Sequence, residues 1–336
     1  MAHSATGVAL DVPPDWPTGA LTSVDVYISS QCNRRCTYCF LPTDFFMSGQ
    51  RMRVESFSGI VNWSKRHGVQ EITLLGGEPS LHPSFAEMIR IVNDKKMAVR
   101  VVTNGARSFR RLLGNGTVPA AHLARVAVSL DCLDPAVQDE FRGPGAWQDA
   151  MATIELLYER GVVFDINVTA VKPVLADIDW LIDFADYRGC RRVNIHWPST
   201  IGIGTTLDPG AVPDRNEWLE LTRRVARRTE RRPDFYVEIE RGYLADDEEL
   251  AGCALADFSN LQILPDGRAY RCGLLVDQPE MASLTMTGDQ LRLTGLGHGE
   301  ERLRDDWLPS CTGCPVMRAD GRRACIYDKV SSLRSW

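Results

Sequence analysis

The chain has 336 residues, of which 44% are hydrophobic and 24% are charged, as in ordinary globular proteins. It has no apolar run of about 18 residues, so the sequence predicts no membrane span, and residues 1–22 lack the basic and apolar regions of a signal peptide. The net charge of −6 argues against a general nucleic-acid-binding protein.

Six short β-branched runs alternate with amphipathic helical patterns along the chain. The expected strands are residues 24–29, 71–75, 99–103, 126–130, 164–170 and 192–196. Six such β-α units imply a parallel sheet with right-handed crossovers. We therefore expect an α/β fold in the form of a partial, TIM-like (β/α)6 barrel. Two of the helices begin with capping boxes, Ser84 to Glu87 and Asp214 to Glu217.

Three cysteines, Cys32, Cys36 and Cys39, follow the first expected strand in a C-x3-C-x2-C spacing. Three thiolates on one loop can each bind one iron of a cubane 4Fe–4S cluster, which leaves the fourth iron open to a ligand. The alternatives are a zinc knuckle, a disulfide with a spare thiol, and buried structural cysteines. Ten cysteines without an export signal favour metal ligation over disulfides, and no nearby His or Cys completes a zinc site.

Polar residues follow the other expected strands at the same end. The second strand runs into Gly76-Gly77-Glu78-Pro79, where two glycines allow a close backbone approach and Glu78 offers a carboxylate to an ammonium group; the simpler interpretation is a turn before a helix. The later strands end at Thr103, Ser129, Asp131 with Cys132 beside it, and His196. Because catalytic groups of βα barrels lie at the carboxyl ends of strands, we expect one active site there.

Five further cysteines lie near the C-terminus: Cys253, Cys272, Cys311, Cys314 and Cys325. Alternating residues 258–264 and 268–272 flank Pro265-Asp266-Gly267, which predicts a β-hairpin that ends at Cys272. Four cysteines that finish in C-x2-C suit either a structural zinc ion or a second iron–sulfur cluster.

The cysteine loop and Gly76-Gly77-Glu78-Pro79 resemble the motifs of the radical S-adenosylmethionine (SAM) superfamily, whose core fold is such a partial barrel. The resemblance implies that Cys32, Cys36 and Cys39 hold a 4Fe–4S cluster whose open iron chelates SAM, and that an electron cleaves SAM to a 5′-deoxyadenosyl radical. The other cofactor-binding residues that it implies are Tyr38, Gly76, Gly77, Glu78, Thr103, Ser129 and Arg142. Among these, Gly77 and Glu78 match positions that hold the SAM amino group, and Ser129 and Arg142 match positions that bind its carboxylate.

The C-terminal cysteines resemble a twitch domain, the short form of the SPASM domain, which holds one auxiliary 4Fe–4S cluster. Cys253, Cys272, Cys311 and Cys314 are the favoured ligands, with Cys325 able to replace one of them. The expected organisation is an N-terminal extension (1–22), the barrel (23–213), a helical linker (214–250) and a domain formed by a β-hairpin and a helix that binds this cluster (251–336).

Three residues on the expected rim are candidates for catalysis: Cys132, Asp131 and His196. Cys132 would return a hydrogen atom in an epimerisation, although a buried cysteine is the default interpretation for it and for Cys190. His196 is equally compatible with a satisfied core residue and with a polar wall of the substrate cavity.

The function that we expect from the sequence is oxidation of a small hydroxylated metabolite, such as a sugar or aminocyclitol, by a radical SAM oxidoreductase. The first alternative is modification of a ribosomal peptide by a cross-link, a thioether or an epimerisation. The second alternative is a non-enzymatic iron–sulfur electron carrier. A flavodoxin- or ferredoxin-type electron donor and a cytoplasmic location are expected, because such clusters need a reducing compartment; no nucleic acid or membrane partner is expected.

Overall fold

The computed structural model describes residues 21–229, 235–240, 243, 260–270, 272–273, 276, 284–287 and 290–293. Their strands form one sheet in the order β11-β10-β9-β8-β1-β2-β3-β4-β5-β6-β7. Among the described residues, no helix is long and apolar enough to cross a membrane.

Seven strands of this sheet, β1 to β7, are parallel and follow one another in sequence order. Their bounds are β1 Ser23–Ser29, β2 Glu71–Gly76, β3 Ala98–Thr103, β4 Arg125–Ser129, β5 Phe164–Thr169, β6 Arg192–His196 and β7 Tyr236–Ile239. The first six match the expected strands to within one residue at either end. The predicted α/β partial barrel is therefore confirmed.

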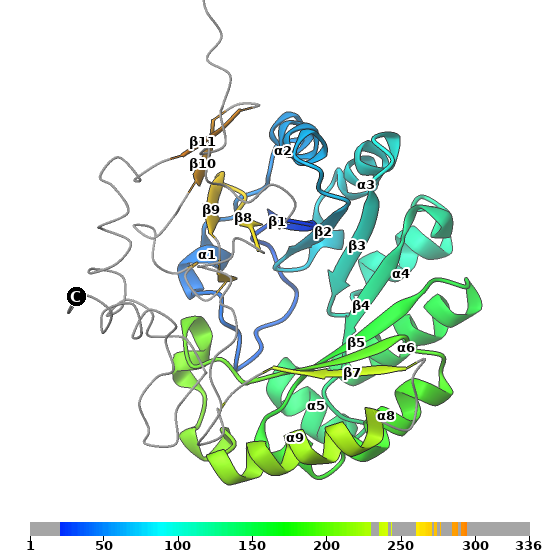
Figure 1. Ribbon diagram of the computed structural model, residues 1–336, viewed down its shortest axis with the longest axis vertical. Helices are drawn as coiled ribbons and strands as arrows, with labels where there is room; N and C mark the ends of the chain where they lie inside the picture. Colours follow the sequence, from blue (N-terminus) through cyan, green and yellow to red (C-terminus); the bar gives the residue numbers. More distant parts are fainter. Residues whose placement is uncertain are drawn as a thin grey trace, which may run out of the picture.

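The helices lie between successive strands. Their bounds are α1 Thr43–Met47, α2 Val54–Arg66, α3 Phe85–Asp94, α4 Arg107–Gly114, α5 Pro135–Arg142, α6 Ala146–Glu159, α7 Lys172–Leu175, α8 Ile178–Tyr187 and α9 Arg215–Thr229. Figure 1 shows β1 to β7 in an arc, with α2, α3, α4, α6, α8 and α9 along its outer side. The core fills the space between helices and sheet with buried residues such as Phe57, Phe85 and Phe164.

The sheet continues beyond the six expected strands. Residues 214–250, expected as a helical linker, include α9 and the strand β7, which pairs in parallel with β6. Within β7 only Val237 is buried, so neither an apolar run nor a clear alternation marks the strand in the sequence. The consequence is that the residue after β7, Glu240, joins the same rim as the ends of the other strands.

The predicted hairpin is present and is shorter than expected. It consists of β8 Gln262–Ile263 and β9 Arg268–Tyr270, antiparallel around a turn with Gly267 at φ 90°. β8 also runs parallel to β1, so the hairpin extends the barrel sheet, followed by β10 Leu284–Thr287 and β11 Gln290–Leu293. The division into domains stays a prediction, and Cys253, Cys311, Cys314 and Cys325 lie outside the described residues.

Candidate active site

A cavity of about 660 Å³ opens at the carboxyl ends of the parallel strands. Cys32, Cys36 and Cys39 all line it, so the cysteine loop faces the interior of the partial barrel. The other expected cofactor or catalytic residues that line it are Tyr38, Gly76, Gly77, Thr103, Ser129, Arg142 and His196. Residues from β1 to β6, and Glu240 after β7, thus line one cavity. The sequence predicted this gathering of the strand ends at one rim.

The two glycines after β2 pack against the cysteine loop itself. The backbone N–H of Gly77 donates to the carbonyl of Ser29 at 2.8 Å, and that of Glu78 donates to the carbonyl of Gln31 at 2.7 Å. A Cβ added to Gly77 would overlap the Gln31 carbonyl and lie 2.8 Å from the Cβ of Cys32. The close approach that requires glycine here is therefore made by the cysteine loop, where the sequence analysis expected a ligand.

Glu78 is fully buried and does not appear among the residues that line the cavity. Its carboxylate accepts hydrogen bonds from the Ser80 hydroxyl at 2.6 Å, the Thr103 hydroxyl at 3.0 Å and the backbone N–H of Asn104 at 2.9 Å. Burial raises the pKa of this carboxyl, and the hydrogen bonds oppose that shift. The side chain joins the ends of β2 and β3, and its direct contact with the SAM ammonium stays a prediction.

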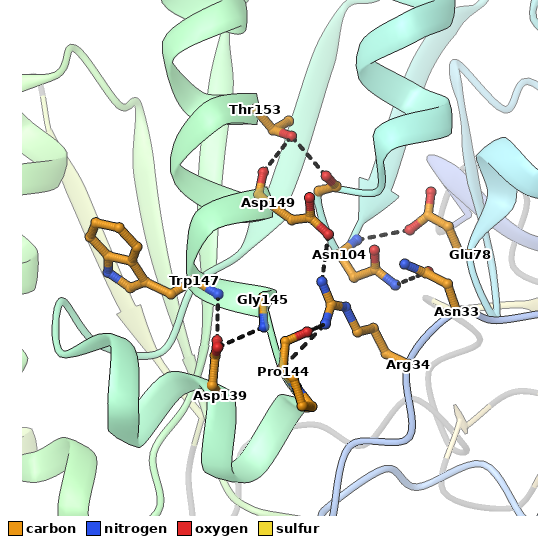
Figure 2. A network of polar contacts seen from close by, with 12 residues as sticks. Asn33, Arg34, Glu78, Asn104, Asp139, Pro144, Gly145, Trp147, Asp149 and Thr153 are labelled. Carbon is orange, nitrogen blue, oxygen red and sulfur yellow. Dashed lines mark hydrogen bonds and ion pairs between the residues drawn. The ribbon is translucent and has the colours of Figure 1, made fainter.

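Asn104 carries this connection on to the cysteine loop, as Figure 2 shows. Its side-chain amide donates to the side-chain oxygen Oδ1 of Asn33 at 2.9 Å and to the Cys32 sulfur at 3.6 Å. Because its backbone is bound to Glu78, the amide approaches Cys32 from a fixed position. Sequence reasoning did not identify Asn104, although it immediately follows Thr103 at the end of β3.

Arg34 ties the same loop to Pro144 and to Asp149 (Figure 2). Its guanidinium donates to the carbonyls of Gly143 and Pro144 and pairs with Asp149 near the start of α6. Asp149 also pairs with Arg110 of α4 at 2.8 Å. The charge of Arg34 is thereby compensated within the protein, and the loop is held to two helices.

A buried cluster of polar side chains, Asp131, Arg142 and Tyr38, lies near Cys36. Asp131, only 1% exposed, accepts two hydrogen bonds of 2.7 Å from the Arg142 guanidinium, one from the Tyr38 hydroxyl and one of 2.8 Å from the Thr169 N–H. Arg142 also stacks over the Tyr38 ring at 5.3 Å. Since Asp131 occupies two donors of Arg142, the expected contact of this guanidinium with the SAM carboxylate stays a prediction.

Two of the catalytic candidates lie away from the cavity. Cys132 is 1% exposed, belongs to the hydrophobic core and donates to the Asp134 carbonyl at 3.4 Å. The default interpretation of a buried cysteine therefore holds, and the alternative position of this thiol on the reactive rim is wrong. Burial raises its pKa to about 12. Asp131 does not line the cavity either; it positions Arg142 and Tyr38, which do. Cys190 is likewise buried, as the default interpretation predicted.

His196 is the catalytic candidate that does line the cavity. Its Nδ1 lies 3.7 Å from Oε2 of Glu240, a residue that sequence reasoning missed. His196 was identified as a polar residue at the end of a strand. Glu240, directly after β7, is a residue of the same kind, and it was missed because β7 was not predicted. Trp197 and Tyr243 extend the same wall.

The three thiols fit a cubane cluster in position and in donor chemistry. They share one loop and one cavity, and thiolates are the ligands that iron–sulfur clusters take in proteins. Burial raises the pKa of Cys32 to about 11 and that of Cys39 to about 12, so a bound metal must displace protons there. Among the described residues, no group of three His, Cys, Asp or Glu side chains converges as the ligand set of a single metal ion.

Of the C-terminal cysteines, Cys272 is the one that the structure describes. It lines the same cavity and packs with Cys32 and Cys39 against a hydrophobic cluster around Tyr27, Leu41 and Tyr270. The hairpin therefore brings Cys272 to the edge of the site that holds the first three cysteines.

Comparison with known proteins gives the family. A model of the radical SAM superfamily matches residues 26–195. The PqqA peptide cyclase of Ruegeria pomeroyi is 21% identical over 322 residues, which cover 91% of this chain and 83% of that protein. The chain spans about half the length of several other curated relatives that it matches.

Solved structures share the fold at low sequence identity. Streptococcus suis SuiB bound to precursor peptide SuiA superposes with a TM-score of 0.61 at 18% identity, over 78% of this chain and 62% of that one. Native anSMEcpe with bound AdoMet and Kp18Cys peptide gives a TM-score of 0.59 at 16% identity, over 92% and 94%. The family model covers half of the 336 residues, including the cysteine loop and the ends of β1 to β5, and the chain belongs to the radical SAM superfamily.

Proposed function

We propose that this radical SAM enzyme oxidises a side chain of a ribosomally made peptide. The observation that carries the proposal is the cavity of about 660 Å³, in which the cysteine loop faces a wall formed by the ends of β6 and β7. The volume lies in the range of ligand pockets and leaves room for a substrate side chain.

The relatives favour a peptide over the small hydroxylated metabolite that the sequence analysis preferred. PqqA peptide cyclase matches nearly the whole chain, and the superposed SuiB and anSMEcpe structures hold peptides. The electron-carrier alternative does not account for a cavity lined by Thr103, Ser129 and Asn167 beside the cysteines. A carrier needs only a bound cluster, whereas these polar strand ends offer hydrogen bonds to a ligand.

Family membership implies SAM and a 4Fe–4S cluster, and Cys32, Cys36 and Cys39 are the residues that would hold the cluster. When bound, the two supply a 5′-deoxyadenosyl radical that takes one hydrogen atom from a carbon of the substrate. The backbone around Gly76 and Gly77 and the side chains of Thr103 and Ser129 line the part of the cavity that we assign to SAM. The apolar residues Phe40, Leu41 and Phe46 line the same cavity and limit the entry of water.

Oxidation is favoured over epimerisation because Cys132, the expected donor of a returning hydrogen atom, is buried away from the cavity. The substrate radical then loses one electron and one proton, so the product lacks two hydrogens. Cys272 would help to hold an auxiliary 4Fe–4S cluster, which would supply an acceptor for this electron, and the proton would go to solvent. Cys272 supports this route, since it lies at the edge of the same cavity.

The test uses the full chain after anaerobic reconstitution, with SAM, dithionite and synthetic peptides encoded beside its gene. Expected are 5′-deoxyadenosine in proportion to peptide and a peptide product about 2 Da lighter, detected by mass spectrometry. A panel of sugars and aminocyclitols serves as the comparison. Substrate-dependent 5′-deoxyadenosine with an aminocyclitol and none above background with any peptide would contradict the proposal.

A further inference from the structure

Some charged side chains that line the cavity are paired with an opposite charge of the protein, and one is not. Arg34 and Arg142, on the side of the cysteine loop, are each paired with a carboxylate of the protein, Asp149 and Asp131. Glu240, after β7, is the acidic side chain among the described residues that line the cavity. Its neighbour His196 lies 3.7 Å away, beyond hydrogen-bond distance, and no arginine or lysine is paired with Glu240 in the described part of the chain.

Glu240 is held in place and retains an open oxygen. Its backbone N–H donates to the Ile195 carbonyl at 2.8 Å, and its Oε2 accepts the backbone N–H of Trp197 at 3.0 Å. For Oε1 the described residues provide no hydrogen bond. The side chain is 37% exposed, so the carboxylate is fixed at the wall and available to a ligand.

Trp197, whose backbone N–H binds Glu240, and Tyr243 line the same cavity as this carboxylate. The rings of Trp197 and Tyr243 meet edge to face, with centroids 5.3 Å apart and planes at 78°. Trp197 is held in turn against the buried Trp218, with centroids 4.8 Å apart. Aromatic faces attract cations, and a carboxylate next to them adds a charge-assisted hydrogen bond.

We infer that Glu240, Trp197 and Tyr243 form a subsite for a cationic group of the substrate, an alkylammonium or a guanidinium. This inference rests on the proposed function for its peptide context, in which the group is the side chain of a lysine or an arginine. The two arginines that line the cavity are paired with carboxylates of the protein, which leaves Glu240 as the uncompensated charge among the described lining residues. A cation at Glu240 leaves the rest of the substrate directed towards the cysteine loop, where the chemistry begins.

The test measures binding to the reconstituted, SAM-loaded enzyme without a reductant, so that nothing turns over. The probes are two blocked pentapeptides, Ac-Gly-Gly-Xaa-Gly-Gly-NH2, with lysine or the uncharged norleucine as Xaa. We expect the lysine peptide to bind about tenfold more tightly, the size of one charge-assisted hydrogen bond. Glu240→Gln should remove the difference, as measured by calorimetry or saturation-transfer NMR.

Glu238→Gln is the matched control. Glu238 lies in β7, two residues before Glu240, is 60% exposed and pairs with Arg192, and it does not line the cavity, so this variant should keep the preference for lysine. Equal binding of the two peptides by the parent enzyme, or a lysine preference that survives Glu240→Gln, would overturn the inference. A loss of SAM affinity in Glu240→Gln would also overturn it, because Glu240 would then belong to the cofactor.

A third probe, 1-aminopentane, separates this inference from the proposed function. If the amine alone binds as tightly as the lysine peptide and needs Glu240, the cationic subsite stands and a peptide substrate is contradicted. A different result separates the two in the other direction. If the peptides of the turnover test are modified, but the lysine peptide and the amine bind Glu240→Gln as tightly as the parent enzyme, the function stands and the subsite is refuted.

Discussion

Asp131 gives the most quantitative test of how the site is held together. Its carboxylate is 1% exposed and accepts four hydrogen bonds, two from Arg142, one from Tyr38 and one from the Thr169 backbone. Asp131→Asn keeps the shape and removes the charge, which leaves the guanidinium of Arg142 buried without its counter-ion. Breaking a buried pair in this way costs about 3–5 kcal/mol.

The control is an aspartate with the same chemistry at the surface. Asp183 pairs with Arg228 at 2.6 Å, but its side chain is 60% exposed, and such pairs are worth about 0–1 kcal/mol. We therefore expect Asp131→Asn to lower the midpoint of thermal unfolding by about 5–15 °C, and Asp183→Asn by no more than about 3 °C.

The assay is thermal unfolding of both variants, followed by circular dichroism, together with SAM binding to the reconstituted protein. Asp131→Asn should also weaken SAM binding, because Arg142 and Tyr38 line the cavity and lose their common anchor. Adding Arg142→Gln to Asp131→Asn should recover part of the lost stability, because the double variant no longer buries an unpaired guanidinium. Equal midpoints for Asp131→Asn and Asp183→Asn would refute the reasoning.

Three further predictions follow from single positions. Gly77→Ala should lower the iron bound per chain after reconstitution, because its Cβ would overlap the cysteine loop, whereas Gly114→Ala, with nothing within 4 Å, should not; equal iron in both would contradict the packing argument. Burial raises the pKa of Cys132 and Cys190 to about 12, so neither should react with iodoacetamide at pH 8 in the folded protein, as peptide mass mapping would show. Two clusters imply about eight irons per chain, and Cys272→Ala should leave about four; stoichiometric zinc with four irons in the parent would exclude the second cluster.

The strands and the cysteine loop were predictable because their signals are local. Apolar, β-branched runs locate β1 to β6, and the spacing of Cys32, Cys36 and Cys39 indicates a cluster without knowledge of the fold. The capping boxes show the limit of such signals. Asp214 and Glu217 exchange the expected hydrogen bonds at 2.9 and 2.6 Å. Ser84 stands at the start of α3 without a side-chain cap, because its backbone, at φ −95° and ψ 20°, is not extended.

The direction of a side chain beyond a strand end was not predictable. Ser129 and Asp131 are two residues apart at the end of β4, yet Ser129 lines the cavity and Asp131 points beneath it to Arg142. The loop that follows the strand sets this direction, and it depends on partners from α5 and β5 that are distant in sequence. The hydrogen bonds of Glu78 were not predictable for the same reason, since Ser80, Thr103 and Asn104 supply them.

The cysteine loop is held by its backbone as much as by its side chains. The N–H of Thr37 donates to the Phe141 carbonyl at 2.9 Å, and the carbonyl of Cys39 accepts the N–H of Gly204 at 2.9 Å. These bonds tie the loop to the end of α5 and to the segment after β6, in addition to its bonds with the strand end after β2. A loop fixed at several points by main-chain groups holds its three thiols in one arrangement, and the side chain of Arg34 adds an anchor at Asp149. Main-chain hydrogen bonds place no demand on residue type, so the residues between the cysteines give no sign of them in the sequence. The anchoring role of Arg34 becomes visible only when the fold brings Asp149, 115 positions further along the chain, to its guanidinium.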